Sequence, residues 1–188
     1  MQPEQIVEHI RNGENSAAVE LIDLFYQRIF AFLRRLAGNE ADAADLTQRT
    51  FGRVWQALPR FSGRSSVGSW IHSIAYHTYV DWRRTNRRSE SRSPEWWAER
   101  ASPESRPDDL AADRDLSVRV YSLVDQLEPD LRATVHLHYY QELTLAETAD
   151  AMNVAASTVK YRLRQALEEL AKHLGSERDQ PVTPPLTK

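Results

Sequence analysis

The stretch TLAETADAMNVAASTVKYRLRQALEELAKHL, residues 144–174, predicts a short helix, a tight turn and a longer helix. Thr144 with Glu147 three residues later is a capping-box pattern that starts a helix. Asn153 can adopt the left-handed conformation that a sharp turn needs, so the short helix should end there. A second helix is expected from about Ala156 to His173.

The second helix should turn an apolar stripe to the core and a polar, basic face outward. The expected core stripe is Val159, Leu163, Ala166, Leu167 and Leu170, and the outward residues are Ser157, Lys160, Tyr161, Arg164 and Gln165. This layout is that of a helix-turn-helix, whose second helix enters the major groove of DNA. Lys160 and Arg164 suit guanine edges or phosphates, Gln165 suits adenine, and Ser157-Thr158 at the helix start suit a phosphate. The alternative is an ordinary solvated helix face, but the capped short helix and the turn together favour DNA.

Helical spacing of apolar residues continues through most of the chain, and no alternating strand pattern is convincing. The expected helices cover about 3–11, 22–36, 51–58, 67–82, 116–127 and 131–141. We therefore predict an all-α fold of two small helical domains joined by a flexible linker. The boundaries are residues 1–93 for the first domain, 94–115 for a linker rich in proline and charge, 116–174 for the second domain and 175–188 for a disordered tail.

The first domain contains a small-residue loop followed by a helix of aromatic and basic residues. The loop 61–66, FSGRSS, offers small hydrogen-bond donors where a backbone can approach a ligand closely. The helix that follows carries Trp70, Tyr76, His77, Tyr79 and Trp82, and then Arg83, Arg84, Arg87 and Arg88. Aromatic rings can stack on unpaired bases while arginines follow the phosphates, so the pattern favours single-stranded nucleic acid. Trp70 also fits a core position, whereas the four arginines have no obvious acid to neutralise them.

The segment 42–51, DAADLTQRTF, begins a helix with acids in its first turn, where they favour the helix dipole. The helix dipole does not explain why the polar residues Asp45, Gln48 and Arg49 are followed by the bulky aromatic residues Phe51 and Trp55. Such a surface could dock another helix.

Composition narrows the class of protein. The net charge is −3 and cysteine is absent, which argues against a general DNA coat and excludes disulfides and thiolate metal sites. We find no signal peptide and no run of apolar residues long enough for membrane insertion, so a cytoplasmic protein is expected. His136 and His138 point to different faces of a helix, and no nucleophile–base spacing is present, so we predict neither an enzyme nor a metal or cofactor site.

The chain resembles the extracytoplasmic-function (ECF) sigma factors of bacterial RNA polymerase, from about Glu20 to Leu174 apart from the linker. Five motifs carry the resemblance in the family's order and spacing: DLTQRTF at 45–51, RFSG at 60–63, WIHSIA at 70–75, DWRR at 81–84 and TVK at 158–160. The resemblance implies that residues 20–93 are sigma region 2 and that residues 116–174 are sigma region 4. It implies a subunit that binds core RNA polymerase, recognises promoter DNA and helps to open it, and that has an anti-sigma factor as a partner.

The resemblance also implies residue roles. The residues implied to bind core polymerase are Asp45, Gln48, Phe51 and Trp55. Minus-10 DNA binding falls on Phe61, Ser62, Gly63, Ser65, Ser66, His77, Arg83, Arg84, Arg87 and Arg88. Minus-35 DNA binding falls on Ser157, Thr158, Lys160, Tyr161, Arg162, Arg164 and Gln165.

The chain departs from the family pattern in two places that bear on base preference. Tyr76-His77 replaces the family's frequent Arg-Asn, and Ala155 or Ala156 with Ser157 replaces its usual Pro and Gly.

Trp96-Trp97 in the linker has no family role, and either anchors the linker on a domain or docks a partner such as an anti-sigma protein. Two alternative functions stay open at this point: a sigma-like decoy that binds only an anti-sigma protein, and a stand-alone helix-turn-helix repressor.

Overall fold

The computed structural model describes residues 2–89 and 111–176, and these residues form helices joined by short turns, with no strand among them. The helices are α1 (Pro3–Arg11), α2 (Asn15–Ala37), α3 (Glu40–Ala57), α4 (Val67–Ser89), α6 (Ala111–Gln126), α7 (Pro129–Val135), α8 (Leu145–Met152) and α9 (Ala156–Ser176). A 3-10 turn covers Leu58–Arg60, and a π-helical turn covers His136–Tyr140. The predicted all-α fold is confirmed. None of the described helices is long and apolar enough to cross a membrane.

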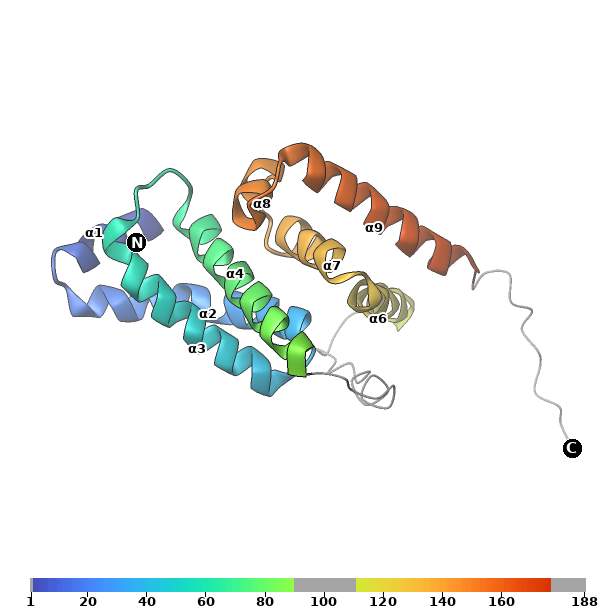
Figure 1. The fold of residues 1–188 in the computed structure, drawn as a ribbon, viewed down its shortest axis with the longest axis horizontal. Helices are drawn as coiled ribbons and strands as arrows, with labels where there is room; N and C mark the ends of the chain where they lie inside the picture. Colours follow the sequence, from blue (N-terminus) through green and yellow to red (C-terminus); the bar gives the residue numbers. More distant parts are fainter. Residues whose placement is uncertain (1, 90–110, 177–188) are drawn as a thin grey trace, which may run out of the picture.

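The connection between α2 and α3 shows how the sequence ends one helix and starts the next. Gly38 has φ +79°, the left-handed conformation that favours glycine, and its N–H donates to the Arg34 carbonyl over 2.9 Å. The Asn39 side chain then accepts from the Asp42 N–H over 2.8 Å and caps α3. These adjacent caps place α3 antiparallel to α2 (Figure 1).

The N-terminal half, α1 to α4, has a large apolar core of its own. Ile29, Phe32 and Leu33 of α2 are fully buried with Leu46 of α3 and Ile71 of α4. Helix α1 lies across the end of this bundle at which α2 begins, and it buries Ile6 and Val7 in the same core. The short helix predicted at residues 3–11 is therefore an integral part of this half.

The C-terminal half has a smaller core, formed where α9 packs along α6, α7 and α8. Its buried apolar residues include Val124, Leu131, Val135, Val159 and Ala166. Helix α6 begins at Ala111, so residues 111–115, which we expected in the linker, are helical. Alanines favour helices without adding to an apolar stripe, so periodicity alone does not detect this first turn.

The two halves are packed against each other, with α8 lying beside α4 (Figure 1). The buried cluster of the N-terminal half continues into the C-terminal half and includes Ala133, Leu137, Leu143, Ala151 and Met152. The proposed linker from residue 94 to residue 110, Trp96-Trp97 and the tail from residue 177 lie outside the described residues. The sequence predicted two domains but did not predict this shared contact.

Candidate nucleic-acid interface

The loop between α3 and α4 presents small residues at its tip while its ends are anchored. The ring of Phe61 is buried against Trp70, with the ring centres 4.7 Å apart, so this ring is part of the core. Gly63 has φ +70° with open space around it, and Ser62, Gly63 and Arg64 are exposed. At the far end, the Ser66 hydroxyl accepts from the Ser69 N–H over 3.1 Å and caps α4.

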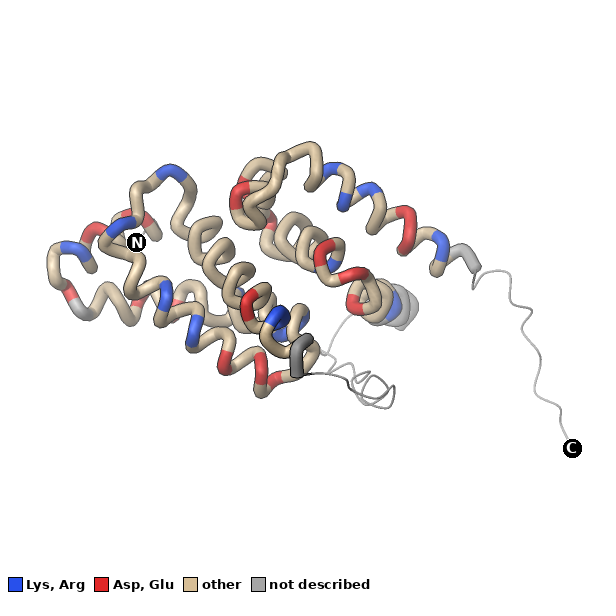
Figure 2. Tube along the Cα trace, viewed as in Figure 1, with Lys and Arg blue, Asp and Glu red and all other residues tan. Residues whose placement is uncertain are grey.

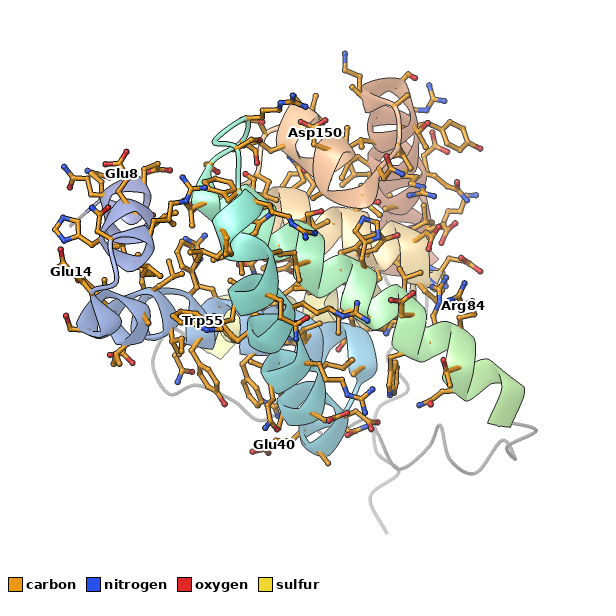
Figure 3. The ribbon with its side chains drawn as sticks, turned by 60° about the vertical axis from the view of Figure 1, so that its left-hand side comes forward. Glu8, Glu14, Glu40, Trp55, Arg84 and Asp150 are labelled. Carbon is orange, nitrogen blue, oxygen red and sulfur yellow. The ribbon has the colours of Figure 1, made fainter. Side chains whose placement is uncertain are left out.

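Helix α4 carries the candidate basic residues after the loop. His77 is exposed, and Arg84 projects from α4 with its side chain 78% exposed (Figure 3). Tyr76, in contrast, is buried. Asp81 lies 3.6 Å from Arg84 and 3.1 Å from Arg53, so the expectation that Arg84 has no acid nearby is wrong. Asp81 stands three residues before Arg84, a spacing that brings side chains together on a helix. The side chains of Arg87 and Arg88 lie outside the described part of the chain.

The surface predicted to dock a helix is present on α3 and extends onto α2. Trp55 is 49% exposed on α3 (Figure 3), and Gln48 is exposed about two turns earlier. Asp45 pairs with Arg49 at 2.7 Å, as an i,i+4 pair. The half-buried Phe51 stacks on Tyr26 of α2 at 6.1 Å. The sequence analysis did not include Tyr26 in this surface, because Tyr26 lies on α2 and not on α3.

The helix-turn-helix has the predicted geometry. Thr144 caps α8 in a full capping box with Glu147, and Asn153 ends α8 with φ +53°, in the left-handed region. Ser157, Lys160, Tyr161 and Arg164 are exposed on the first half of α9, with Gln165 half-buried. The Arg164 guanidinium lies over the Tyr161 ring at 5.6 Å. Lys and Arg recur along α9 and at the tip of the loop before α4 (Figure 2).

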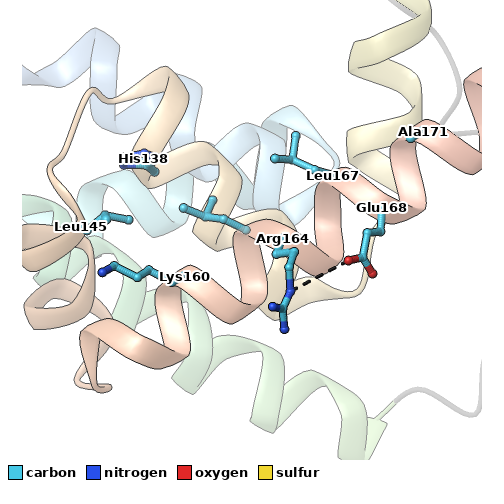
Figure 4. A pocket seen from close by; sticks show the side chains of 8 residues that line it. His138, Leu145, Lys160, Arg164, Leu167, Glu168 and Ala171 are labelled. Carbon is cyan, nitrogen blue, oxygen red and sulfur yellow. Dashed lines mark ion pairs between the residues drawn. The ribbon is translucent and has the colours of Figure 1, made fainter.

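Leu167 was predicted to lie in the core and is instead 51% exposed. Leu163 and Ala166 are buried as expected, but Leu167 lies at the edge of their stripe. It lines a groove with His138, Leu145, Leu163 and Ala171 (Figure 4). Lys160 and Arg164 stand at the same groove, and Arg164 pairs there with Glu168 at 3.9 Å.

Candidate DNA-binding residues from both halves meet at one carboxylate. Asp130, at the start of α7, lies 3.4 Å from Arg83 of α4 and 2.8 Å from Arg162 of α9. The two arginine side chains are only 24% and 20% exposed. Arg83 and Arg162 are therefore held in the contact between the halves, whereas Arg84 and Arg164 face solvent.

A second polar contact joins α4 to the start of the helix-turn-helix. The Ser69 hydroxyl donates to Glu147 over 2.7 Å, and the Ser66 hydroxyl lies 3.3 Å from the same oxygen. These bonds and the Thr144 N–H hold the pKa of Glu147 below its usual range, the Ser69 hydrogen bond having the largest effect. Nearby, buried His72 contacts the Gln141 amide at 3.1 Å and the Gly68 carbonyl at 2.8 Å, and burial lowers the pKa of His72.

The chain is similar to known proteins along both halves. Residues 21–89 match the model of sigma-70 region 2, and residues 117–170 match that of sigma-70 region 4. The chain is 30% identical to the ECF RNA polymerase sigma factor SigX of Bacillus subtilis (strain 168) over 158 residues, which are 82% of this chain and 81% of SigX. This chain belongs to the ECF sigma factors.

Solved structures agree on the fold. The sigma factor RpoE in complex with the anti-sigma factor NepR from Bartonella quintana has a TM-score of 0.67 at 19% identity, covering 86% of this chain and 97% of RpoE. CnrH in complex with the cytosolic domain of CnrY has a TM-score of 0.66 at 20% identity, covering 93% of this chain and 97% of that chain. At this level of identity the likeness establishes the fold alone.

Family membership decides between the alternatives that the sequence left open. The chain is a sigma factor that directs transcription initiation, and sigma factors are subunits of RNA polymerase without catalysis of their own. Among the described residues, no group of three or more His, Asp or Glu is placed to hold a metal ion. Sequence reasoning missed Asp130, Glu147 and Gln141 as contact residues, because their partners in α4 are 47 to 81 positions away in the chain.

Proposed function

We propose that the N-terminal half of this sigma factor recognises and opens the minus-10 element while the C-terminal half reads the minus-35 element. In this proposal, residues 1–93 act as region 2 and residues 116–174 act as region 4. The linker between residue 94 and the start of α6 at Ala111 lets polymerase set their separation, and that separation selects promoter spacing. Two weak DNA readers held together in this way raise each other's effective concentration.

The minus-35 part of the proposal rests on the exposed first half of α9. Lys160, Tyr161 and Arg164 face solvent next to the start of the helix, where backbone N–H groups favour a phosphate. Ser157, Thr158 and Gln165 complete the surface that would enter the major groove.

The minus-10 part rests on the loop before α4 and on α4 itself. The exposed tip, with Ser62, Gly63 and the half-buried Ser65, would accept a base that has left the duplex. His77 and Arg84 would contact the strand alongside it, because both are exposed on α4. Phe61 would act from beneath the loop, since its ring packs on Trp70.

Core polymerase would bind the surface of α3 formed by Asp45, Gln48, Phe51 and Trp55. The exposed indole of Trp55 would supply an apolar anchor, and the polar residues two to three turns before it would supply hydrogen bonds that orient the partner. Such a face fits a helical partner, and the matching part of polymerase would be the clamp coiled coil.

The packed arrangement of the two halves has to open for this function. Arg83 and Arg162 would exchange Asp130 for DNA phosphates, and Ser66 would leave Glu147. An anti-sigma factor is the expected partner that opposes this step, which the structural neighbour solved with the anti-sigma factor NepR supports. The chain would act in the cytoplasm, with polymerase.

The observation that carries the proposal is the exposed basic face of α9 after a complete helix-turn-helix. Adding the chain to core polymerase on a promoter library should produce specific transcripts that depend on the chain. Lys160→Ala should lower promoter affinity about fivefold, while Lys172→Ala, at the far end of α9, should leave it unchanged. Replacing Arg83 and Arg84 together with Ala should impair opening; normal opening would refute the region 2 assignment.

A further inference from the structure

Helix α1 lies outside the part of the chain that the region 2 model matches, yet it contacts both ends of the loop before α4. At one end, a single guanidinium nitrogen of Arg11 donates to the carbonyl of Phe61 and, over 3.4 Å, to that of Leu58. At the other end, the Glu4 carboxylate accepts from the Val67 N–H over 3.4 Å.

Both contacts add hydrogen bonds to backbone groups at helix ends. The Leu58 carbonyl already accepts from the Phe61 N–H over 3.1 Å, so Arg11 is its second donor. The Leu58 and Phe61 carbonyls follow the end of α3, where a cation is favoured by the helix dipole. The Val67 N–H opens α4, where an anion is favoured, and it adds to the cap that Ser66 provides. The charges of α1 therefore match the two ends that border the loop.

Glu4 and Arg11 are seven residues apart, two turns of α1, so they lie on one face of this helix. The separation between the loop ends is thereby set by a rigid element, which itself is fixed by buried Ile6 and Val7. The tip between these ends has no such support, because nothing lies within 4 Å of a Cβ placed on Gly63. The loop combines fixed ends with a free tip.

We propose that Glu4 and Arg11 are positioning residues for the minus-10 loop: they hold its two ends at the spacing that a flipped base requires. This inference rests on the proposed function of the loop and adds α1 to it. A loop whose ends are already placed loses less conformational freedom when it closes on a base, so opening is favoured.

The test uses holoenzyme made with the full-length chain, on a promoter with 2-aminopurine in the non-template strand of the minus-10 element. Fluorescence of that base reports opening. Arg11→Met keeps an unbranched side chain without the donor, and it should reduce opening about three- to tenfold. Arg11→Lys should recover most of the signal, because one nitrogen makes both bonds.

Glu4→Gln should also reduce opening. Glu8→Gln is its matched control and should leave opening unchanged. Glu8 is exposed on α1 one turn later. Core binding and binding to minus-35 duplex should be unchanged in every variant, which a general loss of structure would not allow.

Normal opening with both Arg11→Met and Glu4→Gln would overturn the inference. So would a loss of opening that core binding shares in equal measure, because that result indicates a merely structural role. If Arg11→Met does not fold, Glu4→Gln decides alone. Failure of the unsubstituted chain to open any promoter would instead refute the proposed function.

Discussion

The two halves of this sigma factor differ in how they bury their apolar residues. The N-terminal half surrounds Phe32, Ile29 and Leu46 with its own helices. The C-terminal half has eight buried apolar residues in its own cluster and gives five more to the core of its neighbour, within the described residues. The first half is built to be self-sufficient, whereas the second is completed by the contact.

The difference has a consequence for promoter recognition. Separating the halves exposes apolar residues such as Leu137 and Met152, and burial of apolar area is the main driving force of folding. Polymerase and DNA must therefore compensate for the lost contact when they bind the two halves apart. We therefore expect the closed arrangement to oppose unproductive DNA binding by the free subunit.

The largest expected effect concerns Leu137, which is fully buried in the shared cluster. Leu137→Ala should lower the free energy of unfolding by about 3 kcal/mol, through lost burial and the cavity left behind. Urea unfolding followed by circular dichroism measures this change. Leu167→Ala is the matched control, and an exposed leucine should change stability by less than about 0.5 kcal/mol. Equal effects at both positions would show that the shared core is not closed in solution.

The second prediction uses pH to weaken the fold through His136, a buried histidine of the C-terminal half. Burial, with Arg35 and Arg132 nearby, lowers the pKa of His136 to about 3, so the folded chain keeps this ring neutral. Below pH 6.5 the unfolded chain binds a proton that the folded chain does not, so stability is present above that pH and is lost as pH falls. The loss is about 1.4 kcal/mol per pH unit, or about 2 kcal/mol at pH 5.

The measurement compares two signals of unfolding between pH 7 and pH 5. Trp55, Trp70 and Trp82 lie on helices of the N-terminal half and no tryptophan follows residue 97, so tryptophan fluorescence does not report on the C-terminal half, whereas circular dichroism follows both halves. His136→Gln should flatten the pH dependence seen by circular dichroism. An unchanged slope in this variant would mean that His136 is not buried in the neutral form.

The sequence predicted the elements and the exposed basic residues well, because these depend on local rules. Caps at Thr144 and Asn153, and the stop at Gly38, were visible as residue types at fixed spacing. Leu167 shows the limit of periodicity, because a residue at the edge of a stripe is buried only where another helix reaches it. The pairing of Asp130 with Arg83 and Arg162 depends on how the halves pack, which no local spacing encodes.

The third prediction concerns that carboxylate. Asp130→Asn removes two partly buried ion pairs and should weaken the closed arrangement by about 1 kcal/mol, since such pairs contribute modestly. Small-angle scattering should show a larger radius of gyration, and promoter affinity should rise a few-fold as Arg83 and Arg162 are released. Asp150→Asn, on the exposed side of α8 (Figure 3), is the matched control. A variant that stays compact and binds DNA no better would argue against Asp130 as a restraint.

The smallest expected effect is at the contact between Glu147 and Ser69. Glu147 serves two partners, because one of its oxygens accepts from Thr144 within the capping box and the other accepts from Ser69 across the halves. Glu147→Gln retains a side chain that can complete a capping box. Ser69→Ala removes the shorter hydrogen bond across the halves, together with the 2.7 Å contact between the Ser69 and Ser66 hydroxyls. A double-mutant cycle on unfolding free energy should give a coupling of about 0.5 kcal/mol between these positions. The same cycle in a Leu137→Ala background should give a smaller coupling energy, because the hydrogen bond depends on the halves being packed. A coupling energy that stays unchanged in that background would place the bond within one rigid unit.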